Sequence, residues 1–138
     1  MAEGNPERQK NNLKVVMHLL DSNIIIYSAD IRYSFLRSYF TDSQGLLASI
    51  SVIEVLGFNK LNPTDKKYFE AVFKIIPVIP LTDAVIQEAV LIRQTHNISV
   101  ADSIIAATSI MTDATLMTRN VEDFRNIKRL KLINPLEK

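Results

Sequence analysis

The chain has 138 residues, of which 47% are hydrophobic and 22% are charged, a composition that predicts one globular domain with a buried core. The 16 Lys and Arg residues and 15 Asp and Glu residues give a net charge of +1, so a nucleic-acid-binding surface would need local clustering of positive charge. The absence of cysteine excludes disulfides, thiolate catalysis and cysteine-based zinc sites.

The first residues differ in character from the rest of the chain. Residues 1–14 are polar and aperiodic, which predicts a disordered leader before a domain at residues 15–138. No apolar stretch approaches the ~18–20 residues of a membrane span. No secretory signal is recognised either, because His18 and Asp21 interrupt the apolar run that starts at Val15. The sequence therefore predicts a cytoplasmic protein.

Short apolar runs alternate with segments of helical periodicity along the predicted domain. The apolar runs predict buried strands at residues 15–20, 45–50, 77–81 and 114–117, and residues 130–133 are a candidate fifth strand. Prolines flank the third run, which suits a strand at the edge of a sheet or the start of a strand.

Helical periodicity and capping residues predict the segments between the strands. Thr64, Thr82 and Ser99 are expected to cap helices. The predicted helices lie at residues 31–40, 52–61, 64–75, 82–95 and 99–111. Buried strands that alternate with helices are typical of a three-layer α/β/α fold with a mostly parallel sheet, here of four to five strands. In such sheets, ligands bind outside the carboxyl ends of the strands.

Three acidic residues lie where the loops of such a sheet come together. Asp21 ends the first strand, Glu54 follows the second, and Asp102 follows the turn at residues 97–99. Each lies beside apolar sequence, where an isolated buried charge is very costly. A carboxylate in such a place must be solvated, paired or bound to a metal.

Each acid also has a structural interpretation. Ser51 and Glu54 have the spacing of a capping box, and Ser99 and Asp102 nearly have it. The segment at residues 21–23 could form a strand-to-helix turn.

Taken together, the three acids favour a metal site. The two histidines lie apart: His18 is interpreted as a strand side chain, and His96 as a solvated turn residue. Carboxylates are then the main ligand set, and clustered carboxylates suit Mg²⁺ or Mn²⁺. Without a cation, such acids would repel one another and raise each other's pKa.

Four segments resemble the motifs of PIN domains. The first resembles their LDTN opening, the second their S-x-x-x-x-E-L-x-x segment, the third their D-x-x-I-A-A-T-A helix, and the fourth their L-V-T-R-D/N-x-x-D/E-F strand and loop. The segments are LLDSNI (19–24), SISVIEVLG (49–57), SVADSIIAAT (99–108) and LMTRNVEDF (116–124). They occur in the family's order and the resemblance covers residues 17 to about 135. Length and layout are most similar to the VapC-type toxin branch of the family.

The resemblance implies a ribonuclease that depends on Mg²⁺ or Mn²⁺. It implies that Asp21, Glu54 and Asp102 are the catalytic, metal-binding residues. It places Asn120 where many members have a fourth acid, which leaves a second metal site open. Asp123 could supply a replacement carboxylate, although a role as a turn or helix-start acid is preferred.

The resemblance also implies supporting roles around the acids. Asn23 and Thr118 would orient ligands or a water, and their alternative role is hydrogen bonding at strand ends. The expected chemistry is phosphodiester hydrolysis, in which the metal and the carboxylates activate water because no histidine is placed as a general base.

Contact with RNA would require positive charge near this acidic site. Arg119, Arg32 and Arg37 adjoin the motifs and are candidates for contacts with backbone phosphates, with a solvated surface role as the alternative for each. Aromatic residues of the first segment could stack on bases, although a core or interface role is preferred. These are Tyr27, Tyr33 and Phe35.

The VapC-type resemblance further implies a homodimer and a small antitoxin protein that blocks the site. Residues 31–40 have the composition of a partner-facing helix, and equally that of an amphipathic core helix. A catalytically inactive PIN-fold scaffold or RNA-binding subunit is the main alternative, and a DNA-directed nuclease is not excluded. A receiver-like signalling domain is disfavoured, because the first strand offers only Asp21 and the third offers no phosphoacceptor.

Overall fold

The computed structural model describes residues 16–42 and 44–137, so the predicted leader at residues 1–14 lies outside the described residues. Its centre is a parallel sheet with the strand order β3-β2-β1-β4-β5. The strands are β1 (His18–Leu20), β2 (Gly45–Ala48), β3 (Val78–Ile79), β4 (Thr115–Met117) and β5 (Leu132–Ile133). The predicted parallel sheet is confirmed, together with its fifth strand and the edge position of β3.

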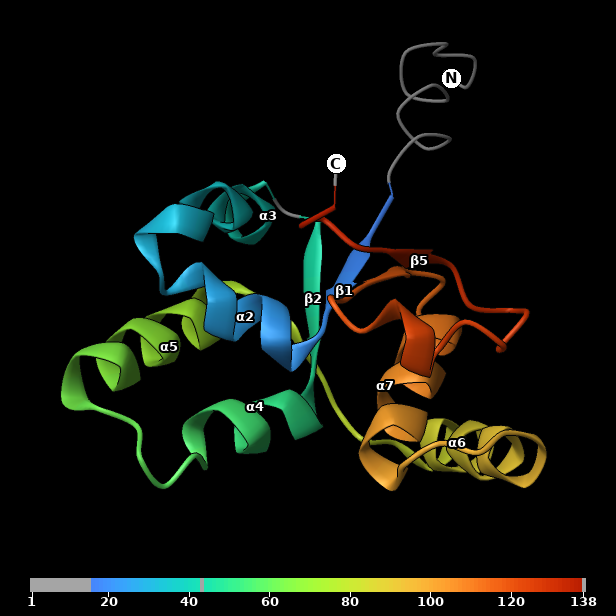
Figure 1. Ribbon diagram of the computed structural model, residues 1–138. Helices are drawn as coiled ribbons and strands as arrows, with labels where there is room; N and C mark the ends of the chain where they lie inside the picture. Colours follow the sequence, from blue (N-terminus) through green and yellow to red (C-terminus); the bar gives the residue numbers. More distant parts are fainter. Residues whose placement is uncertain (1–15, 43, 138) are drawn as a thin grey trace, which may run out of the picture.

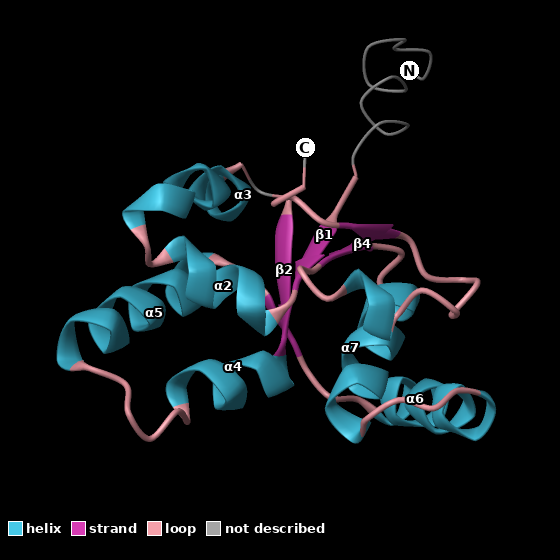
Figure 2. Cartoon of the chain, in the orientation of Figure 1, coloured by secondary structure: helices cyan, strands magenta, loops and turns pink. Residues whose placement is uncertain are grey.

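Helices cover both faces of the sheet, which confirms the three-layer α/β/α fold (Figure 1). α2, α3, α4 and α5 lie on one side, and α6 and α7 lie on the other (Figure 2). The helices are α2 (Ser22–Ser28), α3 (Ser38–Thr41), α4 (Ser49–Leu56), α5 (Pro63–Ile75), α6 (Asp83–Thr95) and α7 (Val100–Met111), with the 3₁₀ helices η1 (Ile31–Arg37) and η2 (Val121–Asp123). None of the helices in the described part is both long and apolar enough to cross a membrane.

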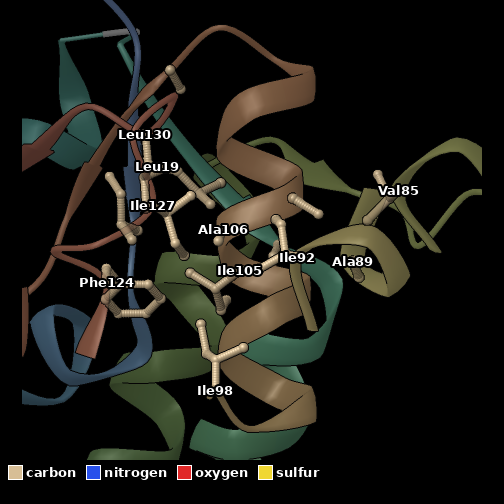
Figure 3. Packing of buried hydrophobic residues seen from close by; sticks show 14 of the residues in the cluster. Leu19, Val85, Ala89, Ile92, Ile98, Ile105, Ala106, Phe124, Ile127 and Leu130 are labelled. Atoms are coloured by element: carbon tan, nitrogen blue, oxygen red, sulfur yellow. The ribbon is translucent and has the colours of Figure 1, made fainter. Parts of the chain in front are cut away.

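Side chains alternate between the two faces of the central strands, and both faces are buried. Leu19 and Leu116 belong to the core beneath α6 and α7, which also contains Ile105 and Phe124 (Figure 3). Leu20 and Met117 belong to the second core, beneath α2, α3 and α5. Strands buried on both faces carry continuous apolar runs, which is why they are visible in the sequence.

Capping residues set the start of the longer helices. The hydroxyl of Thr82 accepts a hydrogen bond from the Val85 N–H, and that of Ser99 accepts one from the Asp102 N–H, which confirms both predicted caps. The cap of α5 is Asn62, not the predicted Thr64. Asn62 takes this role because Pro63 suits the first helical position, where an N–H is not needed.

The largest disagreement with the sequence prediction is at the β2–α4 junction. The predicted strand at 45–50 ends at Ala48, and α4 begins at Ser49 instead of residue 52. Ser51 is therefore inside the helix and buried, with no hydrogen-bond partner for its hydroxyl, so the predicted capping box with Glu54 is wrong. Ser51 and Val55 are the buried positions of α4, one turn apart, so packing decides where the helix lies.

Two shorter segments also differ from the predictions. The chain forms α2 directly after Asp21, a helix that the sequence reasoning did not predict as such. The predicted helix at 31–40 is split into η1 and α3. His96 is half-buried instead of solvated, because it ends α6 and its Nε2 lies 3.1 Å from the carbonyl oxygen of Asn126.

Candidate active site at the carboxyl edge of the sheet

The strand order places a topological switch point between β1 and β4. The chain leaves β1 toward β2 and β3, and later returns to the other side of β1 to form β4 and β5. The loops after β1 and β4 therefore turn in opposite directions, and ligands bind at such a switch point in open α/β sheets. Asp21 follows β1 and Thr118 follows β4, so both lie at this point.

Asp21 is buried and held by three hydrogen-bond donors. It is the N-cap of α2, and its Oδ1 accepts a bond of 2.8 Å from the Ser22 N–H. Its Oδ2 accepts bonds from the Thr118 hydroxyl, at 2.8 Å, and from the Asn23 amide, at 3.4 Å. These contacts fix the orientation of the carboxylate at the end of β1.

Thr118 and Asn23 join the loops after β1 and β4. The Asn23 amide also donates to the Thr118 hydroxyl oxygen, and the Asn23 Oδ1 accepts a hydrogen bond from the backbone N–H of Arg119. The Thr118 hydroxyl oxygen accepts a further bond from the backbone N–H of Asn120. The polar residues that the sequence singled out are thus brought together around Asp21, with Asn120 joined through its backbone.

Glu54 reaches the same region from α4. Its Oε1 accepts a hydrogen bond of 2.5 Å from the hydroxyl of Ser22, while the rest of the side chain is exposed. The sequence reasoning did not identify Ser22 as a site residue. In the sequence, only the position of Ser22 next to Asp21 could have pointed to it. Its bond to Glu54 depends on the packing of α2 against α4, which the sequence alone does not reveal.

Asp102 lies in the first turn of α7 and is half-buried. Asp123, at the end of η2 after β4, is close enough that its negative charge acts on Asp102. The exposed Asn120 precedes η2 and makes no side-chain capping bond to it. The described structure therefore brings a fourth carboxylate to the region from position 123.

The negative charges of these acids act on one another. Burial raises the pKa of Asp21 to about 6, and the charges of Asp102 and Glu54 act in the same direction, against the hydrogen bonds from Thr118 and Ser22. Burial also raises the pKa of Asp102, with further contributions from the charges of Asp123 and Glu54. Mutual repulsion of this kind is relieved by a bound cation.

The residues fit a hard divalent cation in kind and in charge. Clustered carboxylate oxygens are the ligands that Mg²⁺ and Mn²⁺ prefer. The ion pairs among the described residues do not include Asp21, Glu54 or Asp102, so no described side chain neutralises the charge of these acids. Within residues 16–42 and 44–137, however, no group of three or more His, Asp or Glu side chains is arranged so that it could hold a metal ion.

The three candidate arginines differ in their surroundings. The exposed Arg119 directly follows Thr118, and its guanidinium lies 5.5 Å from the centre of the Tyr27 ring. Arg32 is paired with Asp30 at 2.6 Å. Arg37 donates a hydrogen bond of 2.8 Å to the carbonyl oxygen of Ser28, so its guanidinium tethers η1 to the end of α2.

The aromatic residues of this segment form a chain of ring contacts. Tyr27 and Tyr33 meet edge to face, with ring centres 5.0 Å apart, and the ring of Phe35 is 6.5 Å from that of Tyr33. Tyr27 and Tyr33 are half-buried, whereas Phe35 is exposed. Tyr27 is the member that also contacts Arg119.

Several solved structures share this fold, and one of them is described as a toxin–antitoxin complex. A chain of a toxin–antitoxin complex from Klebsiella pneumoniae is 24% identical, with a TM-score of 0.73, and the match covers 88% of this chain and 99% of that chain. FitAcB from Neisseria gonorrhoeae is 26% identical, with a TM-score of 0.73 and coverage of 88% and 100%. VapBC2 from Rickettsia felis, bound to a DNA fragment from its promoter, is 21% identical, with a TM-score of 0.73 and coverage of 86% and 98%.

The sequence comparison agrees with the structural one. No significant match to a curated protein sequence is found. The PIN domain family matches residues 18–130, a range that includes all three acids and Thr118. The resemblance of the four motifs is thereby confirmed, and the chain belongs to the PIN domain family.

Proposed function

We propose that this chain is a ribonuclease that depends on Mg²⁺ or Mn²⁺, and that it is the toxin of a toxin–antitoxin pair. One observation carries the proposal. Asp21, Glu54 and Asp102 come from three separate segments and lie close enough at the switch point to repel one another. Membership of the PIN domain family supports a nuclease.

Asp21, Glu54 and Asp102 would hold the cation, with Asp123 as a further carboxylate beside Asp102. When bound, the cation would lower the pKa of a water molecule and stabilise negative charge on the phosphoryl oxygens. The reaction consumes one water molecule for each phosphodiester bond and leaves a phosphomonoester and a hydroxyl group.

The other residues of the site would orient its carboxylates and the substrate. Thr118 and Asn23 hold the Asp21 carboxylate through hydrogen bonds. Arg119 is the arginine that we place on a backbone phosphate, because it adjoins the acids and is exposed. Arg32 and Arg37 are less suited to this phosphate contact, because Arg32 is paired with Asp30 and Arg37 tethers η1 to α2.

An antitoxin partner is supported by the structural neighbours and by exposed apolar surface near Glu54. The K. pneumoniae neighbour is described as a toxin–antitoxin complex. Glu54 lies at the rim of a groove of about 290 Å³ that Phe58 and Phe69 help to line. On η1, Ile31 is 76% exposed and Phe35 is 53% exposed, which suits a surface that a partner covers. We also propose a homodimer and a cytoplasmic location.

The alternative is a catalytically inactive scaffold or RNA-binding subunit. Asn120 favours it, because a neutral amide stands where many members of the family have an acid. In that case the protein would bind divalent cations weakly and would not cut RNA.

Cleavage of a small-RNA pool tests the proposal. Purified chain, free of any antitoxin, is incubated with Mg²⁺, Mn²⁺ or EDTA, and Asp102→Asn is compared with wild type. Asp113→Asn is the matched control, because exposed Asp113 pairs with Lys131, away from the acids, and asparagine tolerates the positive φ of 54° at this position.

Cation-dependent cuts at discrete sites are expected for wild type and Asp113→Asn, and not for Asp102→Asn. Absence of cleavage by folded wild-type protein in both metals would support the inactive scaffold. Equal cutting of single-stranded DNA of the same sequence would point to a less selective nuclease.

A further inference from the structure

Ser22 connects the first turn of α2 to α4. It is the first residue of α2 and is buried, and its hydroxyl donates a hydrogen bond of 2.5 Å to Glu54 Oε1. The bond joins residues that are 32 positions apart in the chain. It lies beside the carboxylate of Asp21, which accepts a hydrogen bond from the backbone N–H of the same serine.

The capping of α2 does not require this hydroxyl. The Asp21 carboxylate already accepts a hydrogen bond from the Ser22 N–H. The Ser22 hydroxyl instead donates its hydrogen bond to Glu54, on helix α4. Ser28, at the opposite end of α2, behaves differently. Its hydroxyl donates a hydrogen bond to the Ile25 carbonyl oxygen and contacts the Tyr68 hydroxyl, and neither partner is one of the candidate acids.

Glu54 needs such a tether to remain near the other acids. Glu54 is exposed, and its negative charge acts on both Asp21 and Asp102. Without a hydrogen bond, both repulsion and conformational entropy favour an orientation toward solvent. The Ser22 hydroxyl opposes both effects, because it donates to the negatively charged carboxylate.

We propose that Ser22 is a positioning residue whose hydroxyl holds Glu54 near Asp21 and Asp102, the other carboxylates that we propose for divalent-cation binding. This inference rests on the proposed function and extends it to the assembly of the site. A bond that orients a ligand from outside the coordination shell strengthens metal binding, typically by 10–100-fold.

Mn²⁺ binding to the metal-free protein tests the inference without reference to activity. The titration follows free Mn²⁺ by electron paramagnetic resonance for wild type, Ser22→Ala and Ser28→Ala. We expect Ser22→Ala to weaken Mn²⁺ binding roughly 10-fold. Ser28→Ala removes a buried hydroxyl from the same helix, and is expected to lower the melting temperature while Mn²⁺ affinity stays within about 2-fold of wild type.

A double-mutant cycle separates positioning from a general structural effect. Glu54→Ala is expected to weaken Mn²⁺ binding, and adding Ser22→Ala to it should cause no further loss, because the bond is already absent. Ser22→Thr keeps the hydroxyl and should bind Mn²⁺ better than Ser22→Ala. If Ser22→Ala does not fold, Ser22→Cys makes the same comparison, because a thiol is a weak donor.

The outcomes distinguish the two proposals. The positioning role would be overturned if Ser22→Ala bound Mn²⁺ with wild-type affinity. It would also be overturned if Ser22→Ala weakened Mn²⁺ binding equally in the wild-type and the Glu54→Ala backgrounds. Either result would leave the proposed nuclease intact. Wild-type protein that binds no Mn²⁺ would overturn the proposed metal-dependent function, and the role of Ser22 with it.

Discussion

Of the acids at the site, ionised Asp21 should lower the free energy of unfolding of the metal-free protein the most. Its pKa is raised from 3.8 to about 6, with burial as the largest cause. We predict that Asp21→Asn stabilises the metal-free protein at pH 7.5. Asparagine has nearly the same shape, caps a helix as well as aspartate does, and carries no charge. Its Oδ1 can accept the hydrogen bond from the Ser22 N–H, as the Oδ1 of Asp21 does.

The magnitude follows from the two pKa values. They differ by about 2 pH units, and each unit corresponds to about 1.4 kcal/mol, so ionised Asp21 reduces the free energy of unfolding by up to about 3 kcal/mol. Because the folded-state pKa is the higher one, the cost is present at pH values above about 6 and disappears as the pH falls toward 3.8. The advantage of Asp21→Asn should therefore be largest at pH 7.5 and shrink toward pH 4.

Urea unfolding in EDTA at pH 7.5, 6.0 and 4.5 measures this difference. The midpoint should rise in Asp21→Asn at pH 7.5 with an unchanged slope. Adding Mg²⁺ or Mn²⁺ should stabilise wild type, by ~2.7 kcal/mol at 100 times the dissociation constant, and should stabilise the variant much less. Exposed Asp113→Asn serves as the control, and its stability should stay within about 0.5 kcal/mol of wild type at every pH. A less stable Asp21→Asn protein at pH 7.5, or a difference that does not vary with pH, would refute the reasoning.

Three further predictions concern the surroundings of the site and the core. Thr118→Val removes the donor to Asp21 and should lower the free energy of unfolding by ~1–3 kcal/mol in urea, with reduced RNA cleavage; an unchanged midpoint would show that the bond is dispensable. Arg119→Ala should weaken RNA binding and reduce the slope of log affinity against log salt by about 1, whereas Arg37→Ala should mainly lower stability; the reverse pattern would assign the phosphate contact to Arg37. Phe124→Ala, at a side chain only 1% exposed, should cost ~3–5 kcal/mol in the same unfolding assay, and a loss below about 1 kcal/mol would contradict its place in the core.

Local chemistry made much of the fold predictable from the sequence. Thr82 and Ser99 were identifiable as caps because a cap acts on an N–H only three residues away. The strands were recognisable because both of their faces are buried, which requires nearly continuous apolar runs. Where the prediction failed, at α4, the apolar run GLLASI continued past Ala48, and the register of Ser51 and Val55 against the core decided the boundary.

The acids of the candidate site could also be chosen from the sequence. Asp21 and Glu54 follow apolar runs and Asp102 opens a helix, and the carboxyl ends of parallel strands meet at one edge. Their roles remain proposals that the cleavage and Mn²⁺ experiments test.

The partners of these acids were decided only by the tertiary structure. The Ser22–Glu54 bond spans 32 positions and the Thr118–Asp21 bond spans 97, so each exists only because the strand order places these loops together. The surroundings of Arg119 and Arg37 were also decided by the tertiary structure. Both side chains carry the same charge, and only their contacts in the fold distinguish them. Sequence periodicity indicated which segments enter the core, because those preferences act over a few residues. The topology of the sheet determined which side chains meet, because hydrogen bonds and repulsion act through space.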